Sequence, residues 1–412
     1  MGKKILIVGN GAREYALAKK FSEEHEIFVA PGNDTMKEFA TIVDIRPNKI
    51  NELLDFALEN NIDMTVPLAQ EAIQNDIAAR FTENKQCIFA PTANANIISA
   101  NKILSKKILY KLRIPTPKFG IFEKANLALD YIKNQKIPFV CKTNDSNSAV
   151  IFTSASTAKN YVETVFTEKN KKIIIEDYVY GTPFSYYAIT DGYKALPLGS
   201  SLTYKHSLDG NGGQLTSGTG ACSPNYKLSY DNEYFLMDNV IYPTLEYLER
   251  DSNPYMGIMG VNGILTDDGE IVVLGWQTFM QDCDCAAVLN SLDEDLYSLF
   301  YSCIIGSFSD EVENIRCNNL YSVSVVLSCA NRQNSDNAIE GLDNIDDGTI
   351  ITFYPSVTKN KYLEYNVQNG MSLMVTSSSS SVAKAAQKTY SELKELSFRG
   401  MQYRKDICLM HA

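Results

Sequence analysis

The chain lacks several features that would assign it to a class of protein at once. Its 412 residues include no apolar run long enough to cross a membrane, and the start MGKKILIVGNG leads into an expected strand rather than a signal peptide. Only three histidines are present, and they lie far apart in the sequence. We therefore expect a cytoplasmic protein with no membrane partner.

Basic residues are outnumbered by acidic ones. The sequence has 38 Lys and Arg residues against 49 Asp and Glu residues, a formal net charge of −11. Proteins that bind nucleic acids or anionic membranes need a basic face to neutralise phosphates. The acidic balance therefore argues against a nucleic-acid partner. A local basic pocket for a phosphorylated small molecule is still compatible with this net negative charge.

Cysteine pairs with metal-binding spacing are also missing. The nine cysteines include no CxxC pair, which is typical of small buried side chains in a reducing cytosol. Cys283, Asp284 and Cys285 are adjacent, but no second Cys or His cluster completes a tetrahedral metal set. The surrounding stretch, VVLGWQTFMQDCDC at 272–285, raises the question of an altered metal site.

The first 100 residues alternate apolar strands with helices. This alternation predicts right-handed crossovers and a parallel sheet between helices, which together make a three-layer α/β domain. In such sheets, ligands bind beyond the carboxyl ends of the strands. Those ends are expected at residues 9–13, 31–33, 67–71 and 91–92.

The remaining residues are expected to form mixed α+β units. We predict a basic helix over 98–113, two strands joined by a polar loop over 136–152 and a helix over 156–167. Further strands are expected over 171–179 and 184–199, a broken helix or helix pair over 231–250 and a hairpin over 260–275. The Gly/Ser/Thr-rich segment Ser201–Pro224 is expected to be a long loop, and the run Thr376–Ser381 a polar loop and cap before a helix. The domains are expected at 1–100, at 101–305 with a lid at about 115–190, and at 315–412.

The first strand is followed by the turn GNGARE, which has the first two glycines of a phosphate-binding turn. Glu14 stands where the third glycine would be, and its charge disfavours a pyrophosphate. Two interpretations stay open. The turn is either a tight strand-to-helix connection or a place where a small phosphate meets the amides of Gly9, Asn10 and Gly11.

Two lysines are better candidates for anion binding. Lys106 lies on the basic helix and Lys142 ends the apolar strand FVCK, where a lysine is costly to bury unless an anion meets it. Glu176 and the residues up to Val179 follow another apolar strand and suit the edge of an adenine. Solvated lysines and an exposed strand end are the competing interpretations.

Taken in order, these motifs resemble those of phosphoribosylamine–glycine ligase, an ATP-grasp enzyme that makes glycinamide ribonucleotide in purine synthesis. The resemblance rests on GNGARE, APGN, FAPT, the lysine helix before IPTP, VCK, IIIEDYV, GACSP and QYRKDI, at family-like spacing over essentially the whole chain. It implies an α/β and α+β multidomain fold: a three-layer α/β N-terminal domain, a central ATP-grasp domain and a small C-terminal α+β domain. The chain is similar to a divergent member of this family.

The resemblance also implies an activity and a set of site residues. The family joins glycine to 5-phosphoribosylamine through glycyl phosphate and converts ATP to ADP and phosphate, with Mg or Mn and lysines stabilising the transferring phosphoryl group. By resemblance, ATP would be bound by Lys106, Lys142, Glu176, Asp177 and Val179. The catalytic positions would be Lys205, Asp209, Thr216 and Gly218, and the substrate-binding positions Gly9, Asn10, Gly11, Arg13, Gly32, Asn33 and Glu71.

Some family motifs are altered in this sequence. The glycine-rich closing loop after Lys142 is replaced by TNDSNSAV at 143–150, and Pro183 stands where the family has a ribose-binding Glu. In the stretch 272–285, Gly275 replaces the metal-binding Glu of the family. Hard cations prefer carboxylate ligands. The remaining candidate metal ligands are Gln277, Asp282 and Asp284.

Two main hypotheses for the function follow from these observations. The chain is either a working ligase, or a catalytically degenerate homologue that keeps the scaffold as a ligand- or partner-binding protein. A third interpretation is a ligase that activates a different carboxylate with ATP. We expect small-molecule partners, glycine and phosphoribosylamine, and a monomeric protein.

Overall fold

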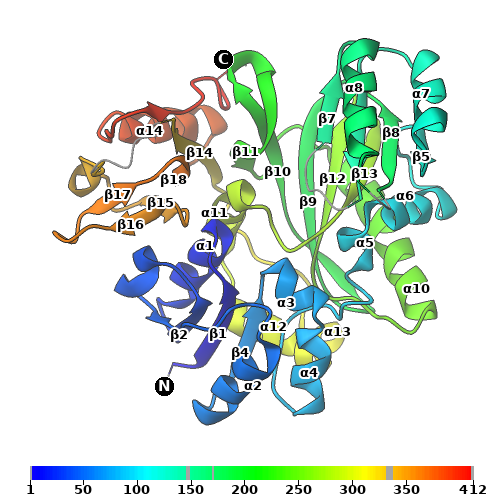
Figure 1. Cartoon of the computed structure of the whole chain (residues 1–412). Helices are drawn as coiled ribbons and strands as arrows, with labels where there is room; N and C mark the ends of the chain where they lie inside the picture. The colour runs from blue at the N-terminus through cyan, green and yellow to red at the C-terminus, as the bar shows by residue number, and fades with distance from the viewer. Residues whose placement is uncertain (1, 145–148, 169–170, 331–336, 410–412) are drawn as a thin grey trace.

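The computed structural model describes residues 2–144, 149–168, 171–330 and 337–409. Its N-terminal part is a parallel sheet of β1 (Lys4–Gly9), β2 (Glu26–Pro31), β3 (Thr41–Ile42) and β4 (Met64–Pro67), in the order β3-β2-β1-β4. The helices are α1 (Ala12–Phe21), η1 (Asp34–Glu38), α2 (Ile50–Glu59), α3 (Gln70–Gln74) and α4 (Ile77–Glu83). The prediction of a parallel α/β sheet at this end of the chain is confirmed (Figure 1).

Apolar side chains on both faces of β1 pack against helices on both sides of this sheet. Ile5 and Ile7 pack in a core that includes α1, whereas Leu6 and Val8 pack with residues of α2 and α4. Successive side chains of a strand point to opposite faces, so a continuous apolar run fits a sheet that is covered on both sides. The carboxyl ends of β1, β2 and β4 therefore lie together at one edge of the sheet, as the sequence predicts.

A second unit is an antiparallel sheet with two helices on one face. It consists of β5 (Phe119–Phe122), α7 (Ala125–Lys133), β6 (Phe139–Thr143), β7 (Ala149–Phe152), α8 (Ala155–Val165) and β8 (Ile173–Asp177), with the strand order β5-β8-β6-β7. Cys141 and Ile175 pack against α7 and α8. Lys142 and Glu176 follow them by one residue, so they point to the opposite face. Two short helices, α5 (Ile97–Ala100) and α6 (Lys102–Lys111), precede this unit where a single basic helix was expected.

The largest sheet, nine-stranded within the described residues, runs in the order β13-β12-β9-β10-β11-β14-β18-β15, with β19 beside β14. Its strands are β9 (Thr182–Asp191), β10 (Ala195–Leu208), β11 (Gly212–Ser223), β12 (Met256–Leu265), β13 (Ile271–Thr278), β14 (Tyr321–Cys329), β15 (Thr349–Phe353), β18 (Gly370–Ser379) and β19 (Met401–Gln402). Hydrogen bonding between β11 and β14 carries the sheet into the C-terminal part of the chain. The domain limits at 305 and 315 stay predictions.

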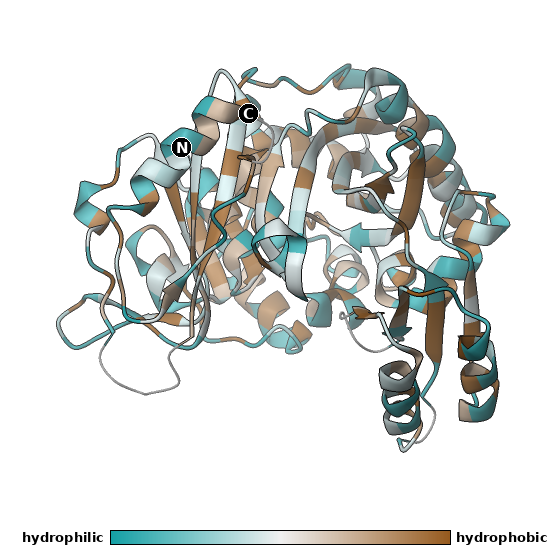
Figure 2. Cartoon of the chain, turned by 90° about the horizontal axis from the view of Figure 1, so that it is seen from above, coloured by the Kyte–Doolittle hydropathy of each residue, from teal (hydrophilic) through white to brown (hydrophobic). Residues whose placement is uncertain are grey.

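The remaining elements surround this sheet. They are η2 (Asp209–Asn211), α9 (Tyr230–Leu236), the π-helical turn η3 (Met237–Ile241), α10 (Tyr242–Arg250), α11 (Asp282–Ser291), α12 (Leu296–Ile305), α13 (Phe308–Glu311), η4 (Leu342–Asn344), β16 (Val357–Lys359), β17 (Tyr365–Val367) and α14 (Val382–Leu393). Hydrophobic residues concentrate along the strands, and hydrophilic residues on the outer turns of the helices (Figure 2). None of the helices in the described ranges is long and apolar enough to cross a membrane.

Two of the expected loops were wrong. The segment Ser201–Pro224 is mostly a hairpin of β10 and β11, and Thr376–Ser379 belongs to β18, so that only Ser381 has the expected role of capping α14. Gly, Ser and Thr suggested a loop, but Leu202 and Cys222 pair across the strands and are buried in the core. Tertiary pairing thus overrides a composition that is weak in strand formers.

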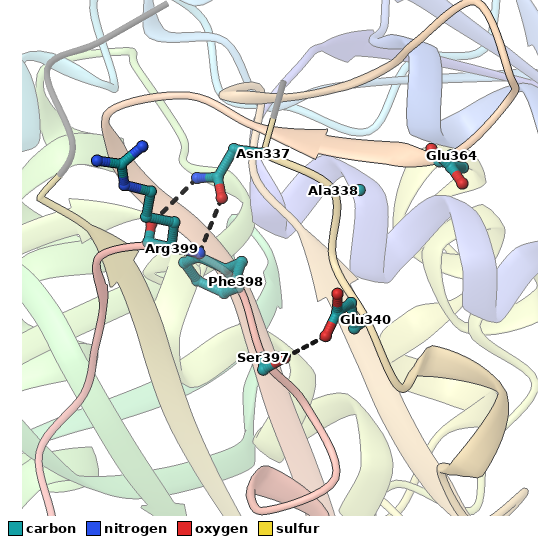
Figure 3. A pocket seen from close by; sticks show the side chains of 7 residues that line it. All are labelled: Asn337, Ala338, Glu340, Glu364, Ser397, Phe398 and Arg399. Carbon is teal, nitrogen blue, oxygen red and sulfur yellow. Dashed lines mark hydrogen bonds between the residues drawn. The ribbon is translucent and has the colours of Figure 1, made fainter. Parts of the chain in front are cut away.

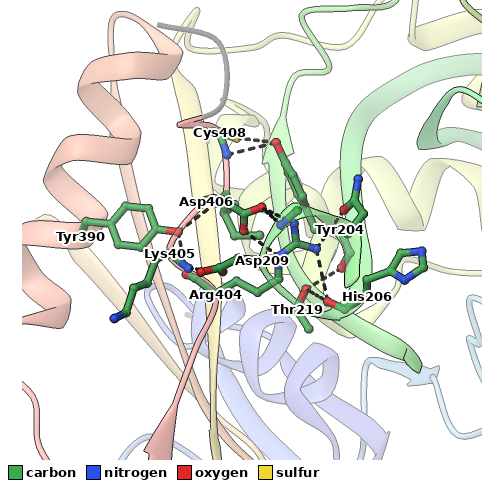
Figure 4. Close-up of polar contacts among 12 residues, drawn as sticks. Tyr204, His206, Asp209, Thr219, Tyr390, Arg404, Lys405, Asp406 and Cys408 are labelled. Carbon is green, nitrogen blue, oxygen red and sulfur yellow. Dashed lines mark hydrogen bonds and ion pairs between the residues drawn. The ribbon is translucent and has the colours of Figure 1, made fainter. Parts of the chain in front are cut away.

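The β10–β11 hairpin is fixed to the end of the chain by a buried arginine (Figure 4). Arg404 Nε and Nη2 donate to the two carboxylate oxygens of Asp406 at 2.8 and 2.6 Å. Arg404 Nη1 donates to the His206 carbonyl at 3.2 Å and to Asn211 Oδ1 at 3.1 Å. At the hairpin tip, Asp209 Oδ1 accepts from the Lys405 amide at 2.8 Å. The C-terminal segment therefore holds the hairpin in place through a charged, bidentate contact.

We predict that Arg404→Met lowers the free energy of unfolding by about 3–5 kcal/mol, because it leaves the Asp406 charge without its partner. Urea unfolding followed by circular dichroism measures this change. The control is Arg250→Met, which removes an exposed ion pair with Glu246 and should change the free energy by no more than about 1 kcal/mol. Equal stability of the two variants would contradict the prediction.

Candidate functional site

Two lysines from separate elements meet at one carboxylate. Lys106 on α6 places its Nζ 2.8 Å from Glu176 Oε2 on β8, and Lys142 on β6 makes an ion pair with Glu176 Oε1. Lys106 Nζ also donates to Thr116 Oγ1 at 2.8 Å. Lys106 and Glu176 are buried, and Lys142 is nearly so. The structure thus brings together three of the five residues that the sequence assigned to a nucleotide.

The electrostatics of this cluster favour an incoming anion. Burial lowers the pKa of Lys106 to about 8, and the charge of Lys142 adds to this effect, whereas Glu176 opposes it. Burial also disfavours the charged form of Glu176, but Lys142 and Lys106 outweigh it and hold the pKa of that carboxyl below its ordinary value. Two cations share one anion, so the cluster keeps a net positive charge in a poorly solvated place.

The other two predicted nucleotide residues lie differently. Asp177 follows Glu176 on the strand and points away from it, and its carboxylate accepts a hydrogen bond from Gln135. Val179 lies just beyond the end of β8 and is half-buried. Tyr178 and Tyr180 beside it form an edge-on ring pair with centroids 4.9 Å apart. The segment after β8 therefore presents apolar and aromatic surface next to the lysines.

The predicted catalytic residues lie on the β10–β11 hairpin, but not all at one place. Thr216 Oγ1 donates to the Lys205 carbonyl at 2.9 Å and accepts from the Gly218 amide at 3.1 Å, so these three residues are adjacent. Asp209 is apart from them at the hairpin tip, bound to the C-terminal segment. Burial lowers the pKa of Lys205; the Asp284 charge opposes this effect and the Lys142 charge adds to it. The charges of Lys205 and Lys142 therefore influence each other.

The candidate metal ligands are engaged with other groups. Gln277 Oε1 accepts from Asn262 Nδ2 at 3.0 Å and from Gln281 Nε2 at 2.6 Å, and Gln277 Nε2 donates to the Tyr187 hydroxyl at 2.9 Å. Tyr187 in turn donates to Asp284 Oδ2 at 2.5 Å. No group of three or more His, Cys, Asp or Glu side chains in the described residues is placed to hold a metal ion.

The network depends on a glycine between its members. Gly260 on β12 pairs with Tyr187 on one side and with Gln277 on the other. A Cβ at Gly260 would lie 2.4 Å from Gln277 Cγ and 3.0 Å from Tyr187 Cε1. The missing side chain therefore lets Gln277 and Tyr187 meet across the central strand.

The turns predicted to bind the phosphoribosyl substrate lie side by side. The Gly32 amide donates to the Gly9 carbonyl at 3.1 Å, and Asn33 Nδ2 donates to the Asn10 carbonyl at 2.9 Å. The Gly11 amide already donates to Glu14 Oε2 at 2.9 Å, so one of the amides expected for a phosphate is occupied by a buried carboxylate. The tight strand-to-helix turn is the interpretation that these bonds favour.

Arg13 and Glu71 complete the predicted substrate residues. Arg13 Nη2 donates to the Leu68 carbonyl at 2.6 Å, and the Arg13 amide lies 3.3 Å from Asp282 Oδ1. Arg13 thus joins the N-terminal sheet to the start of α11. Glu71 is exposed on the first turn of α3, beyond the end of β4.

A separate hollow of about 510 Å³ lies in the C-terminal part of the chain (Figure 3). It is lined by Asn337, Ala338, Glu340, Glu364, Ser397, Phe398 and Arg399. Ser397 donates to Glu340, and Asn337 bonds to the backbone of Arg399, so its polar groups mostly pair with one another. It shares no residue with the lysine cluster.

Comparison with known families agrees with this arrangement. The model "Phosphoribosylglycinamide synthetase, N domain" matches residues 3–99, and the model "Phosphoribosylglycinamide synthetase, ATP-grasp (A) domain" matches residues 100–285. The chain belongs to the phosphoribosylglycinamide synthetase family. Membership in the ATP-grasp superfamily implies use of ATP and of a divalent metal.

Relatives of this phosphoribosylglycinamide synthetase homologue match it along its whole length. A phosphoribosylamine–glycine ligase of Lactococcus lactis is 28% identical, and one of Clostridium acetobutylicum is 27% identical; each match covers 98% of this chain, and 98% and 99% of the two relatives. The crystal structure of phosphoribosylamine–glycine ligase from Thermotoga maritima has a TM-score of 0.81 at 19% identity, over 98% of this chain and 99% of that one. A biotin carboxylase of Campylobacter jejuni has a TM-score of 0.73 at 14% identity, over 99% and 94% of the two chains. The multidomain fold expected from the sequence is confirmed.

The structure adds polar residues that the sequence did not single out. Tyr187 and Asn262 lie within strands and meet Gln277 only through strand pairing. Thr116 lies in the IPTP segment. There the prolines predict the end of a helix, but nothing local indicates that the threonine hydroxyl belongs to the site. Of the segment 143–150 that stands in place of the family's closing loop, residues 145–148 lie outside the described part of the chain.

We predict that Glu176→Gln lowers the pKa of Lys106 below about 8, because the neutral amide no longer stabilises the ammonium group against burial. NMR titration of the lysine side-chain carbons measures this pKa. The matched control is Glu163→Gln, which removes the partner of exposed Lys159 and should leave Lys106 unchanged. A raised pKa of Lys106 in Glu176→Gln would contradict the role given to Glu176.

Proposed function

We propose that this member of the family is a phosphoribosylamine–glycine ligase, which joins glycine to 5-phosphoribosylamine with ATP in purine synthesis. The observation that carries the proposal is the convergence of Lys106 and Lys142 on Glu176, within a chain that matches named ligases from end to end. Cationic side chains that meet in a poorly solvated place are suited to bind and stabilise phosphates.

The proposed reaction has two steps. A glycine carboxylate oxygen attacks the γ-phosphorus of ATP, the bond to the β-phosphate oxygen breaks, and ADP leaves. The amine of phosphoribosylamine then attacks the carbonyl carbon of glycyl phosphate, loses a proton and expels phosphate. In this proposal Lys106, Lys142 and Lys205 hold the phosphates, and the segment from Glu176 to Val179 borders the adenine.

The glycine and phosphoribosylamine sites are assigned by position. The turns at Gly9–Gly11 and Gly32–Asn33 lie at the carboxyl edge of the N-terminal sheet, the place where parallel sheets bind ligands. Thr216 and Gly218 adjoin Lys205 and would border the glycine carboxylate. We further propose a cytoplasmic monomer, because the substrates are small polar metabolites and a single chain supplies all of these residues.

A metal does not fit the residues present at 275–284. Gly275 has no ligand atom, the Gln277 oxygen already accepts two N–H donors, and Asp284 is fully buried against Tyr187. A cation that bridges ATP phosphates needs carboxylate oxygens. No step of the proposed reaction is therefore assigned to a metal at this position.

This misfit favours a second candidate function. In it, the protein binds the nucleotide and substrates of the ligase but does not catalyse the reaction. Loss of the metal-binding carboxylate removes transition-state stabilisation worth about 10²–10³ in rate. The lysine cluster that binds phosphates is unaffected by this loss. Binding and turnover must therefore be measured separately.

We predict that the purified protein releases ADP only when both glycine and phosphoribosylamine are present, with one glycinamide ribonucleotide formed per ADP. A coupled ADP assay and mass spectrometry of the product measure the two quantities. Long incubations are needed because of the expected rate loss. ATP binding without product would exclude the ligase and support the second candidate.

We also predict that Lys142→Ala abolishes detectable ATP binding in calorimetry, since a charge-assisted contact worth about 1.5–3 kcal/mol is lost. The control is Lys133→Ala, an exposed lysine on α7 of the same unit that pairs only with Asp130. It should bind ATP as the unchanged protein does. Unchanged affinity in Lys142→Ala would show that the nucleotide residues are wrongly assigned.

A further inference from the structure

Three amide side chains form a polar network around Gln277, two residues after Gly275, which stands where the family has its metal-binding Glu. Asn262, Gln277 and Gln281 bond to one another, with Gln281 Nε2 also 2.9 Å from Asn262 Oδ1. The network continues through Tyr187 to Asp284. Its amide members carry no net charge, unlike the carboxylates that a magnesium site requires.

The two carboxylates nearest this network are turned to other partners. Asp284 Oδ2 accepts from Tyr187, and its Oδ1 accepts from the Cys283 thiol at 3.2 Å. Asp282 Oδ1 lies 3.3 Å from the Arg13 amide at the junction with the N-terminal sheet. A divalent cation would have to break these contacts and pay for desolvating itself among amides.

Positive charge is nevertheless available on the other side of the site. Lys106 and Lys142 share Glu176, and Lys205 has no hydrogen-bond or ion-pair partner for its ammonium group within the described residues. Burial and the charge of Lys142 lower the pKa of Lys205, whereas the charge of Asp284 opposes them. Three lysines are thus the candidates for holding phosphates in this part of the chain.

We propose that this site binds adenine nucleotides without a divalent cation, with their phosphates held by Lys106, Lys142 and Lys205. The proposal rests on the proposed function for the location of the nucleotide. A metal-binding carboxylate attracts the cation and repels a bare phosphate; a neutral amide does neither. With Gly275 in place of the family's Glu and a neutral amide at Gln277, both the gain from the metal and the penalty for its absence are lowered.

The test is calorimetric titration of the full-length protein with ADP and with ATP, once in excess EDTA and once in millimolar MgCl₂. We expect each dissociation constant in EDTA to be at most about threefold higher than that in magnesium. This limit corresponds to a loss of about 0.7 kcal/mol in binding free energy. Binding that is tenfold or more weaker in EDTA, by about 1.4 kcal/mol, would overturn the proposal. Absence of binding in both buffers would overturn it as well.

Two variants test the stated cause. Lys205→Met should weaken binding in EDTA by about tenfold or more, as expected for loss of a charged contact, whereas Lys133→Met should not change it. Gln277→Glu is nearly isosteric and introduces one carboxylate into the amide network, so magnesium should now strengthen nucleotide binding. Magnesium-independent binding in folded Gln277→Glu would contradict the explanation from charge.

The outcome of the calorimetric titrations does not depend on the outcome of the ligase assay. Metal-independent nucleotide binding without ADP release would uphold this inference and reject the ligase. ADP release that requires magnesium, together with nucleotide binding that also requires it, would uphold the ligase and reject the inference.

Discussion

The interaction on which the site depends is the buried ion pair cluster at Glu176. One carboxylate receives Lys106 from α6 and Lys142 from β6; it opposes the burial that lowers the pKa of Lys106, and the two lysines hold the pKa of Glu176 below its ordinary value. A buried charge without a partner costs several kcal/mol, so Glu176 keeps both lysines charged and aimed at one place before any ligand arrives. Phosphates can then bind to two ammonium groups that this carboxylate already holds side by side.

The rest of the molecule supports this cluster from different directions. Arg13 connects the N-terminal sheet to the start of α11, and Arg404 fixes the β10–β11 hairpin that carries Lys205. Lys359 and Tyr365 of the C-terminal hairpin both contact Glu38 on η1, next to the Asn33 turn. Charged side chains therefore set the positions of the substrate turns and of the hairpin relative to the lysines. Against this frame, the network around Gln277 consists of amides rather than carboxylates.

The sequence predicted local features well and tertiary contacts poorly. The apolar run at the start and the alternation of strands with helices predicted the N-terminal parallel sheet. Lys106 and Lys142 stood out because lysines next to apolar runs need an anion, but nothing local showed that Glu176, assigned to adenine, would be that anion. Ser201–Pro224 was mistaken for a loop because its buried pairing with neighbouring strands is invisible in composition. Tyr187 and Asn262 went unnoticed for the same reason: Gly260 lets distant side chains meet, and only the strand register shows it.

The most direct test of the whole account is a crystal structure of the protein grown with ADP or ATP in the presence of magnesium. The account predicts that the phosphates lie against the ammonium groups of Lys106, Lys142 and Lys205, that Glu176 stays at the lysine pair, and that no cation touches Gln277, Asp282 or Asp284. A nucleotide bound elsewhere, or a magnesium ion coordinated by the residues of the 275–284 segment, would contradict it.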